Sequence, residues 1–327
     1  MSRSLTQEIK QQALAVGFDA VGISSVLQVR PCEAAIVPDE FLSRILAKLQ
    51  QWLGRGFHAT MSWMARGPDR RANPSLVLPG CRSIISVGIN YYTNHRATER
   101  IGEGRIARYA WGRDYHEIVG QRLQQLEGCI RAIAPHAVTR SYVDTGPIME
   151  KAWAERSGLG WIGKHSNLVS PQFGSWLLLG EVLTTLELSK DEPGTDLCGS
   201  CSLCIQACPT GAITEPYVVD ASRCISYLTI ELRDDGSIPD DLARSLGNRI
   251  FGCDDCLDVC PYNVNAQESR EAAFQPQDMT LSPKLDRLGA FTAAEFASAF
   301  RQSPVRRSKF SGFQRNVSLA QINTRPK

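Results

Sequence analysis

Hydrophobic and polar positions alternate with two different periods along residues 1–190. Helical periodicity, with apolar residues every three or four positions, marks three segments: Thr6–Val16, Phe41–Leu53 and Tyr115–Ile133. Short runs rich in apolar residues predict buried strands at Asp19–Ser25, Ser83–Tyr92, Val138–Val143 and Trp176–Thr184. A further helix is expected from Pro147. Helices that alternate with strands predict a layered α/β (α+β) domain over residues 1–190.

The next segment, residues 191–275, is organised around cysteines. It reads C-x2-C-x2-C-x3-C-P, then a single cysteine, then C-x2-C-x3-C-P: Cys198, Cys201, Cys204, Cys208, Cys224, Cys253, Cys256 and Cys260. The first run has the spacing of bacterial ferredoxins, in which the fourth cysteine binds the other cluster. Eight thiols are the number that two [4Fe–4S] clusters need. This spacing predicts a ferredoxin-like domain that carries electrons one at a time.

The two clusters share the thiols in a defined way. We expect the cluster I thiols to be Cys198, Cys201, Cys204 and Cys260, and the cluster II thiols to be Cys208, Cys224, Cys253 and Cys256. Ile250 stands where a regular second run would begin, so Cys224 completes the second set. Zinc and disulfides are the alternatives. Structural zinc prefers two C-x2-C pairs separated by a longer loop, and disulfides need an oxidising compartment.

Length, composition and charge exclude few classes of protein. The chain has 327 residues, 43% of them hydrophobic, and a net charge of +2, so bulk charge indicates no particular partner. The N-terminus has no apolar signal region, and no run approaches the length of a membrane span. We therefore expect a cytoplasmic protein without a membrane partner.

Residues 276–327 are expected to form a basic C-terminal tail. Leu281–Phe300 has the pattern of one amphipathic helix, with Phe291, Phe296 and Phe300 facing inward. From Arg301 to Lys327 there are seven basic residues and no acidic one. Such a segment is either solvated surface or a patch for nucleic-acid phosphates.

Three segments of the first domain carry candidate chemistry. In VDTGP (143–147), Asp144 ends a strand before Gly-Pro and a helix, so it is either a general acid or a turn-capping residue. In RYAWGRDYH (108–116), Asp114-x-His116 lacks the glycine spacing of cobalt-binding D-x-H-x-x-G sequences, so His116 is interpreted as a loop or helix-start residue and Asp114 as a helix cap. Gly158, Gly160 and Gly163 have dinucleotide-loop spacing but follow a helix, which favours close backbone approach to a bulky cofactor or an ordinary loop.

Taken together, these residues resemble the epoxyqueuosine reductase family over about residues 5–265. The resemblance rests on RRANPSLVLPG (70–80), RYAWGRDYH (108–116), VDTGP (143–147), AERSGLGWIGKH (154–165), CGSCSLCIQACPTGAI (198–213), CISYLTIE (224–231) and GNRIFGCDDCLDVCPYN (247–263). It implies reduction of epoxyqueuosine to queuosine at the wobble position of tRNA anticodon loops. The implied cofactors are two [4Fe–4S] clusters and base-off cobalamin.

The resemblance also implies roles for individual residues. Asp144 is the implied proton donor, and Arg71, Asp144, Leu168, Leu179, Ser226 and Leu257 are the implied cobalamin contacts. Candidates to hold the tRNA are Arg233, Arg306, Arg307, Lys309 and Arg315. The implied electron donor is an unidentified low-potential carrier, and we expect a monomer. Longer members of the family continue into helical repeats, whereas this chain stops at Lys327, so the tail is expected to be truncated.

Two other functions stay open at this point. One is a corrinoid-dependent reductase of a small molecule, similar to the reductive dehalogenases. The other is a non-catalytic, ferredoxin-type electron carrier, which would need neither an acid at Asp144 nor a basic tail.

Overall fold

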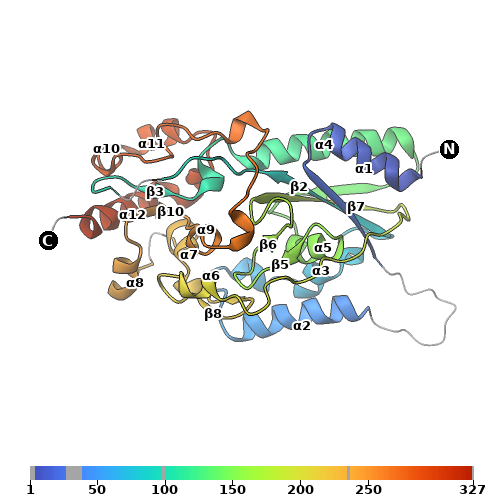
Figure 1. Cartoon of the computed structure of the whole chain (residues 1–327), viewed down its shortest axis with the longest axis horizontal. Coiled ribbons are helices and arrows are strands. Elements are labelled where there is room, and N and C mark those ends of the chain that lie inside the picture. Colours follow the sequence, from blue (N-terminus) through green and yellow to red (C-terminus); the bar gives the residue numbers. More distant parts are fainter. Residues whose placement is uncertain (1–3, 27–38, 98–99, 234–235, 326–327) are drawn as a thin grey trace.

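The computed structural model describes residues 4–26, 39–97, 100–233 and 236–325 (Figure 1). One cysteine, Cys32, lies outside these ranges. The α-helices are α1 (Leu5–Ala15), α2 (Glu40–Gly54), α3 (Pro68–Ala72), α4 (Tyr115–Ile133), α5 (Glu150–Arg156), α6 (Leu203–Gln206), α7 (Ile225–Ile230), α8 (Asp240–Ser245), α9 (Asp255–Asp258), α10 (Leu285–Gly289), α11 (Ala293–Ala299) and α12 (Lys309–Asn323). The strands are β1 (Ala20–Ser25), β2 (Ser83–Asn90), β3 (Arg105–Ile106), β4 (Thr139–Tyr142), β5 (Trp161–Ile162), β6 (Leu168–Val169), β7 (Leu177–Thr184), β8 (Ile213–Glu215), β9 (Val218–Val219) and β10 (Arg249–Phe251).

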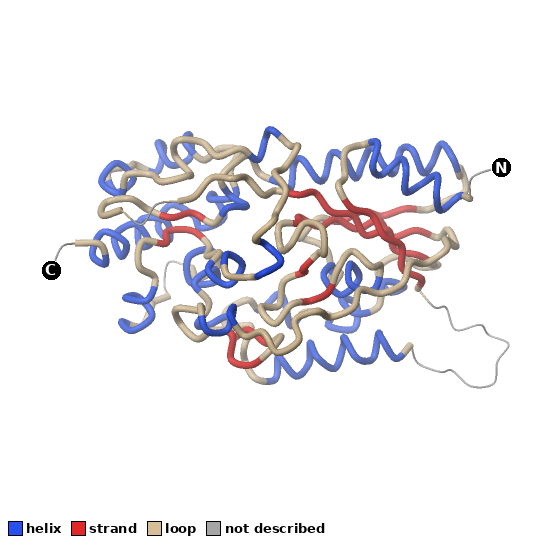
Figure 2. The backbone as a smooth tube through the Cα atoms, viewed as in Figure 1, coloured by secondary structure: helices blue, strands red, loops and turns tan. Residues whose placement is uncertain are grey.

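A four-stranded sheet in the order β1-β2-β7-β4 forms the centre of the first domain (Figure 2). Its neighbouring strands pair antiparallel, with Ile85 opposite both Ile23 and Val182. Every residue of β2 is buried, as expected for a central strand rich in branched side chains. The mixed α/β character predicted from the sequence is therefore present, in its α+β form with an antiparallel sheet.

Helices cover both faces of this sheet. Helices α1 and α4 lie together on one face, and α2, α3 and α5 lie on the other side of the sheet (Figure 1). The α1–α4 side contains the largest hydrophobic cluster, where Ile9, Val87 and Leu126 are fully buried. On the other side Trp153 of α5 is fully buried against Ile84 and Leu183 of the sheet.

Local sequence signals set where the main helices begin. Ser4 and Gln7 form a capping box at the start of α1. Asp114 caps α4 by accepting a hydrogen bond from the backbone N–H of His116, as its position before the helix predicted. The helix expected from Pro147 begins later, at Glu150, because the chain first turns through residues 143–149.

The cysteine segment packs into the first domain. Leu257 and Phe274 are buried in the same hydrophobic cluster as α1 and α4. Strand β10 pairs in parallel with β3, and the backbone N–H of Ala107 donates a hydrogen bond of 2.8 Å to the carbonyl oxygen of Phe251. The cysteine loops are thus held against the domain that precedes them.

The C-terminal residues, expected as a tail with one long helix, are folded differently. Residues 281–300 contain two short helices, α10 and α11, because the chain turns after Gly289 and Thr292 caps a new helix. Phe296 and Phe300 do face inward, and they pack against Phe313 of α12. The hydrophobic cluster that they form also includes Ile106, Trp111 and Phe251 of the preceding segments.

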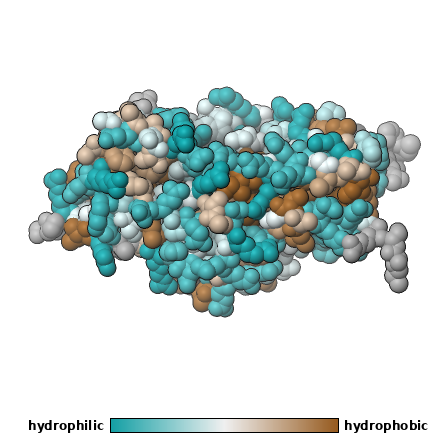
Figure 3. All heavy atoms as spheres, turned by 90° about the horizontal axis from the view of Figure 1, so that it is seen from above, coloured by the Kyte–Doolittle hydropathy of each residue, from teal (hydrophilic) through white to brown (hydrophobic). Residues whose placement is uncertain are grey.

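The surface carries mostly hydrophilic side chains, with hydrophobic residues in smaller separate patches on the face that Figure 3 shows. Within the described ranges, no helix has the length and apolar character to cross a bilayer.

Replacing Phe313 by alanine should lower the free energy of unfolding by about 3–5 kcal/mol, because it empties a fully buried ring site. Ile322 of the same helix is 60% exposed, so Ile322→Ala is the matched control with little expected loss. Anaerobic urea unfolding followed by tryptophan fluorescence measures both. Equal losses in the two variants would show that α12 is not anchored through Phe313.

Candidate active site

The cluster I thiols meet at one small cavity. Cys198, Cys201, Cys204 and Cys260 line a hollow of about 40 Å³, together with Lys164, His165 and Tyr262. Cys204 lies in the first turn of α6, whereas Cys260 lies in the segment after α9. Two stretches of chain about fifty residues apart therefore converge here, as the ferredoxin spacing predicted.

The cluster II thiols form a second group. Burial raises the pKa of Cys256 well above its ordinary value. The neighbouring thiols of Cys253, Cys224 and Cys208 raise it further. The structure thus brings the eight thiols together in the two predicted groups. None of the cysteines in the described ranges forms a disulfide. That each group binds an iron–sulfur cluster stays a prediction at this point.

Donors point at the sulfur atoms of both groups. In cluster I the indole Nε1 of Trp161 lies 3.4 Å from Cys198 Sγ. In cluster II the backbone N–H of Ala212 donates to Cys208 Sγ at 3.2 Å, and Ser226 donates to Cys224 through both its backbone and its hydroxyl. Such donors stabilise negative charge on sulfur, which is what ligand thiolates and cluster sulfides carry.

Asp144 follows β4 in an unusual backbone conformation. Its φ angle is +55°, a left-handed value that is uncommon for a residue with a side chain. The backbone N–H of Asp144 donates to the Glu150 carboxylate, which helps to hold this turn. The Asp144 side chain is 62% exposed, so a substrate can reach its carboxyl group.

A histidine lies between Asp144 and a second carboxylate. His116 Nε2 is 3.3 Å from Asp144 Oδ2, and His116 Nδ1 is 2.7 Å from Asp114 Oδ1. The hydrogen bond from His116 is the main cause that holds the pKa of Asp144 below its ordinary value. Burial lowers the pKa of His116, but its hydrogen bonds to Asp114 and Asp144 outweigh that effect and raise it to about 9. The sequence interpretation of His116 as a plain helix-start residue missed this contact.

Charged groups continue from Asp144 toward the cluster II thiols. Burial raises the pKa of Glu150 to about 7, and the negative charge of Asp144 adds to this effect. Burial lowers the pKa of Lys151, while Glu150, Asp144, Cys256 and Cys224 lie near enough to oppose that shift. Lys151 is nevertheless exposed to solvent. Its Nζ donates to the carbonyl oxygen of Ser166 at 2.9 Å and to Asn167 Oδ1 at 2.8 Å. The region bordered by Asp144, Glu150, Lys151 and the cluster II thiols is called the recess below.

Arg71 borders the same recess. Its Nη2 donates to the carbonyl oxygen of Trp63 at 3.0 Å, and its charge acts on Glu150. The Nε atom of Arg71 and the Oε1 atom of Glu150 are buried and have no hydrogen-bond partner. Buried polar atoms without partners are costly and rare. They indicate that another group completes this site.

The other predicted cobalamin contacts fall in three places. Leu168 and Leu179 pack in one hydrophobic cluster with Ala154 and Leu159. Ser226 lies against Cys224 at the start of α7. The side chain of Leu257 is buried in the α1–α4 hydrophobic cluster, so core packing alone explains an apolar residue at this position.

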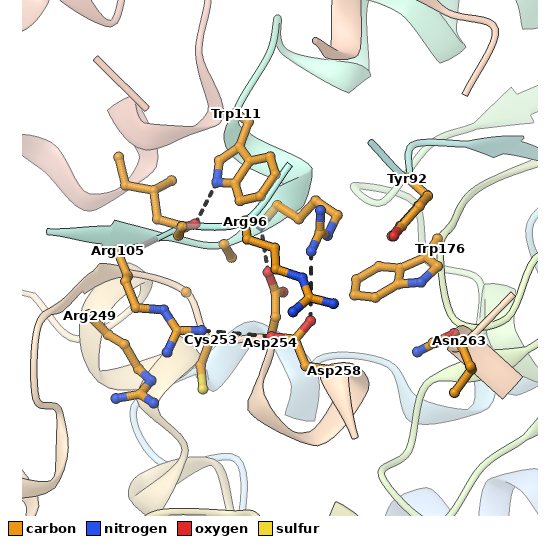
Figure 4. A pocket seen from close by; sticks show the side chains of 16 residues that line it. Tyr92, Arg96, Arg105, Trp111, Trp176, Arg249, Cys253, Asp254, Asp258 and Asn263 are labelled. Carbon is orange, nitrogen blue, oxygen red and sulfur yellow. Dashed lines mark hydrogen bonds and ion pairs between the residues drawn. The ribbon is translucent and has the colours of Figure 1, made fainter. Parts of the chain in front are cut away.

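A further cavity includes Cys253 in its lining (Figure 4). It measures about 400 Å³, and none of the six predicted cobalamin contacts lines it. Arg108 lines it, with its guanidinium 4.5–5.0 Å from the ring centroids of Tyr92, Trp111 and Trp176. The cavity also contains the guanidinium groups of Arg96, Arg105 and Arg249.

The glycine run 158–163 serves close backbone packing. A Cβ atom at Gly160 would lie 2.0 Å from the carbonyl oxygen of Val169, and Gly158 would meet the carbonyl oxygen of Glu192 at 2.5 Å. These contacts bring the backbone of Gly160 close to β6 and that of Gly158 close to the segment at Glu192. The run is therefore not a phosphate-binding loop, which agrees with the sequence interpretation.

The expected tRNA-binding residues differ in whether their side chains are free to contact RNA or are engaged within the protein. Arg306, Arg307 and Lys309 are exposed, and Arg307 binds both carboxylate oxygens of Glu231 while lying near Asp144. Arg233 donates to the carbonyl oxygen of Arg307. Arg315 instead donates to carbonyl oxygens at the end of α7, including that of Leu228 at 2.7 Å, so its main role is structural.

Comparison with known proteins places this arrangement in a class. Residues 197–263 match the family model described as a 4Fe-4S double cluster binding domain. Residues 71–145 match the model described as Epoxyqueuosine reductase QueG, DUF1730. The paired thiol groups and the first match define an iron–sulfur oxidoreductase.

The relatives give the family. The chain is 46% identical to the epoxyqueuosine reductase of Synechocystis sp. over 83% of this chain and 93% of that protein. It is 41% identical to that of Escherichia coli K12 over 97% of this chain and 80% of that protein. The chain belongs to the epoxyqueuosine reductase family.

Solved structures agree with this assignment. A crystal structure of an epoxyqueuosine reductase with an epoxyqueuosine-modified tRNA-Tyr stem loop aligns with a TM-score of 0.85 and 31% identity, covering 98% of this chain and 81% of the other. A Bacillus subtilis structure, with its catalytic aspartate loop swung out of the active site, aligns with a TM-score of 0.83 and 30% identity, covering 98% and 82%.

Replacing Cys224 by alanine should remove one ligand of cluster II. We expect the iron bound per chain to fall from about eight atoms toward four, because a cubane with three thiolates is readily lost. Cys129→Ala is the matched control, since Cys129 lies on α4, apart from both thiol groups. Iron and sulfide assays after anaerobic reconstitution measure the change. Full iron content in the Cys224 variant would contradict the assigned ligand set.

Proposed function

We propose that this chain reduces epoxyqueuosine to queuosine at the wobble position of tRNA, using two [4Fe–4S] clusters and base-off cobalamin. The observation that carries the proposal is that Lys151 lies near both Asp144 and the cluster II thiols Cys224 and Cys256, in a chain of the epoxyqueuosine reductase family. Family membership favours this function over a small-molecule corrinoid reductase and over a plain electron carrier.

The thiol groups fit two cubanes. Each group contains four thiols from separate segments, and donors point at sulfur atoms in both groups. In the described part of the chain, no three His, Cys, Asp or Glu side chains come close enough to hold a single ion. Cubane ligands stand farther apart than the ligands of one ion, so this spacing is compatible with clusters.

The recess fits a large, partly polar cofactor. Arg71 Nε and Glu150 Oε1 are buried without partners, and Lys151 is exposed inside a desolvating environment. Arg71 suits an amide carbonyl or a phosphate of cobalamin, and the partly buried Leu179 offers an apolar contact. When bound, cobalamin supplies a low-potential metal centre that the clusters reduce.

The chemistry of the substrate explains the need for an acid. Removal of an epoxide oxygen as water takes two electrons and two protons. The departing oxygen is a poor leaving group unless it is protonated. Asp144 is exposed at the recess and is placed to deliver that proton.

The exposed arginines near Asp144 suit the RNA. Arg306, Arg307 and Lys309 are exposed close together in the chain, and the charge of Arg307 acts on Asp144. A base must leave the anticodon stack to reach a buried reaction centre, while its flanking phosphates stay outside on basic side chains.

The direct test is anaerobic turnover of the reconstituted enzyme. The protein receives iron, sulfide, cobalamin, a low-potential reductant and a tRNA stem loop bearing epoxyqueuosine. Nucleoside mass spectrometry should show the loss of one oxygen atom, and the conversion should stop when cobalamin is omitted. Intact clusters and bound cobalamin without conversion would contradict the proposed substrate.

Changing Asp144 to asparagine should lower the turnover rate on the order of 10²-fold or more, because the amide cannot deliver the proton. Iron content and cobalamin binding should be unchanged, since the side chain is exposed and nearly isosteric. Single-turnover kinetics with the stem loop measure the rate. Turnover at the wild-type rate would show that Asp144 is not the acid.

Replacing Arg306 by glutamine should weaken stem-loop binding and reduce the dependence of log Kd on log salt concentration by about 0.7–0.9. The side chain is exposed and donates only to the carbonyl oxygen of Arg301, so the fold should persist. Fluorescence anisotropy over a range of salt concentrations measures the slope. An unchanged slope would place the RNA elsewhere.

A further inference from the structure

Both ring nitrogens of His116 face carboxylate oxygens. Nδ1 is 2.7 Å from Asp114 Oδ1, and Nε2 is 3.3 Å from Asp144 Oδ2. A neutral imidazole has one N–H group and an ionised carboxylate has none. Two hydrogen bonds therefore require one extra proton, held either on the ring or on one of the carboxyl groups.

The electrostatic surroundings place that proton on the ring. The pKa of His116 is raised to about 9, while the pKa values of Asp114 and Asp144 are both lowered. At neutral pH the group consists of an imidazolium between two carboxylates. An ionised Asp144 carries no proton to give, so Asp144 alone does not meet the needs of the reaction.

Other packed elements also contribute charge around this group. Tyr115 of α4 donates a hydrogen bond to Asp144 through its hydroxyl group, which lowers the pKa of Asp144. The positive charge of Arg307 from η7 (Pro304–Ser308) acts in the same direction. Other titratable groups also interact with Asp144 or with Arg307. They are Glu150 and Lys151 of α5, Tyr109 of η3 (Arg108–Ala110), and Glu231, which binds Arg307.

Asp114 keeps the ring in place. Its carboxylate accepts hydrogen bonds from both the backbone N–H and the ring of His116, so helix capping and ring orientation depend on one side chain. The His116 side chain is 34% exposed and can exchange protons with solvent.

We propose that His116 is a positioning residue that stores the proton which Asp144 delivers to the substrate oxygen. This inference rests on the proposed function. As the carbon–oxygen bond of the epoxide breaks, the electron pair moves to oxygen, and the proton on His116 Nε2 passes through the Asp144 carboxyl to that oxygen. His116 regains a proton from solvent and the same route supplies the second one. Two electrons from the low-potential reductant complete the balance, with water as the other product.

The pH dependence of the single-turnover rate tests this relay. His116 holds its proton below about pH 9, so the wild-type rate should stay level through neutral pH and fall as the pH rises through about 9. His116→Gln should lower the rate near pH 7.5 on the order of 10²-fold. Its residual rate should rise only in acid, where Asp144 itself binds a proton.

Asp114→Asn is the matched variant. Asparagine keeps the helix cap and an oxygen for the ring N–H, but it removes the charge that raises the pKa of His116. The fall in rate should therefore move from about pH 9 toward the ordinary histidine value near 6.5, with about a tenfold loss at pH 8. A merely structural role for His116 would leave the position of this fall unchanged.

A direct titration gives a second readout. The ¹⁵N signals of His116, assigned with the His116→Gln variant, should titrate near pH 9 in cluster-loaded protein before cobalamin is added. Titration near 6.5, or an unchanged pH profile in Asp114→Asn, would overturn the relay. If wild-type enzyme fails to convert the stem loop while His116 titrates near 9, the proposed function is wrong. The conclusion that His116 stores a proton would still hold.

Discussion

Residues 105–116 connect the cysteine loops to the candidate acid, and the active site depends on how this segment is held. At one end β3 pairs with β10, and the backbone N–H of Arg108 donates to Asp254 Oδ2 at 2.6 Å. At the other end Asp114 and His116 reach Asp144. Because hydrogen bonds fix both ends, the distance between the cluster II loop and the acid is set by one short piece of chain.

That constraint explains why a large domain precedes the cysteines. A ferredoxin needs only its clusters, whereas this chain inserts Leu257 and Phe274 of the cysteine segment into the core of the first domain. The thiols therefore cannot move independently of the sheet. Lys151 and Glu150 then lie between Asp144 and the cluster II thiols, in the recess where the proposed cofactor would receive electrons on one side and substrate on the other.

The sequence predicted the features that are local. Helix α4 has the predicted bounds, and the grouping of the eight thiols follows from ferredoxin spacing. The antiparallel sheet and the packing of the C-terminal helices against one another were not predicted, because they depend on contacts between distant segments such as Phe313 with Phe296. His116 was missed for the same reason: its partner Asp144 is 28 positions away, and only Asp114 is visible as a local cap. The Asp-Tyr-His sequence before a helix was the available signal.

Anomalous diffraction at the cobalt and iron edges, from a crystal of the reconstituted protein, tests the central claim most directly. The account predicts two iron peaks, one at each thiol group, and a cobalt peak in the recess between Asp144 and the cluster II thiols. A cobalt peak away from Asp144, or iron at only one thiol group, would contradict the proposed site.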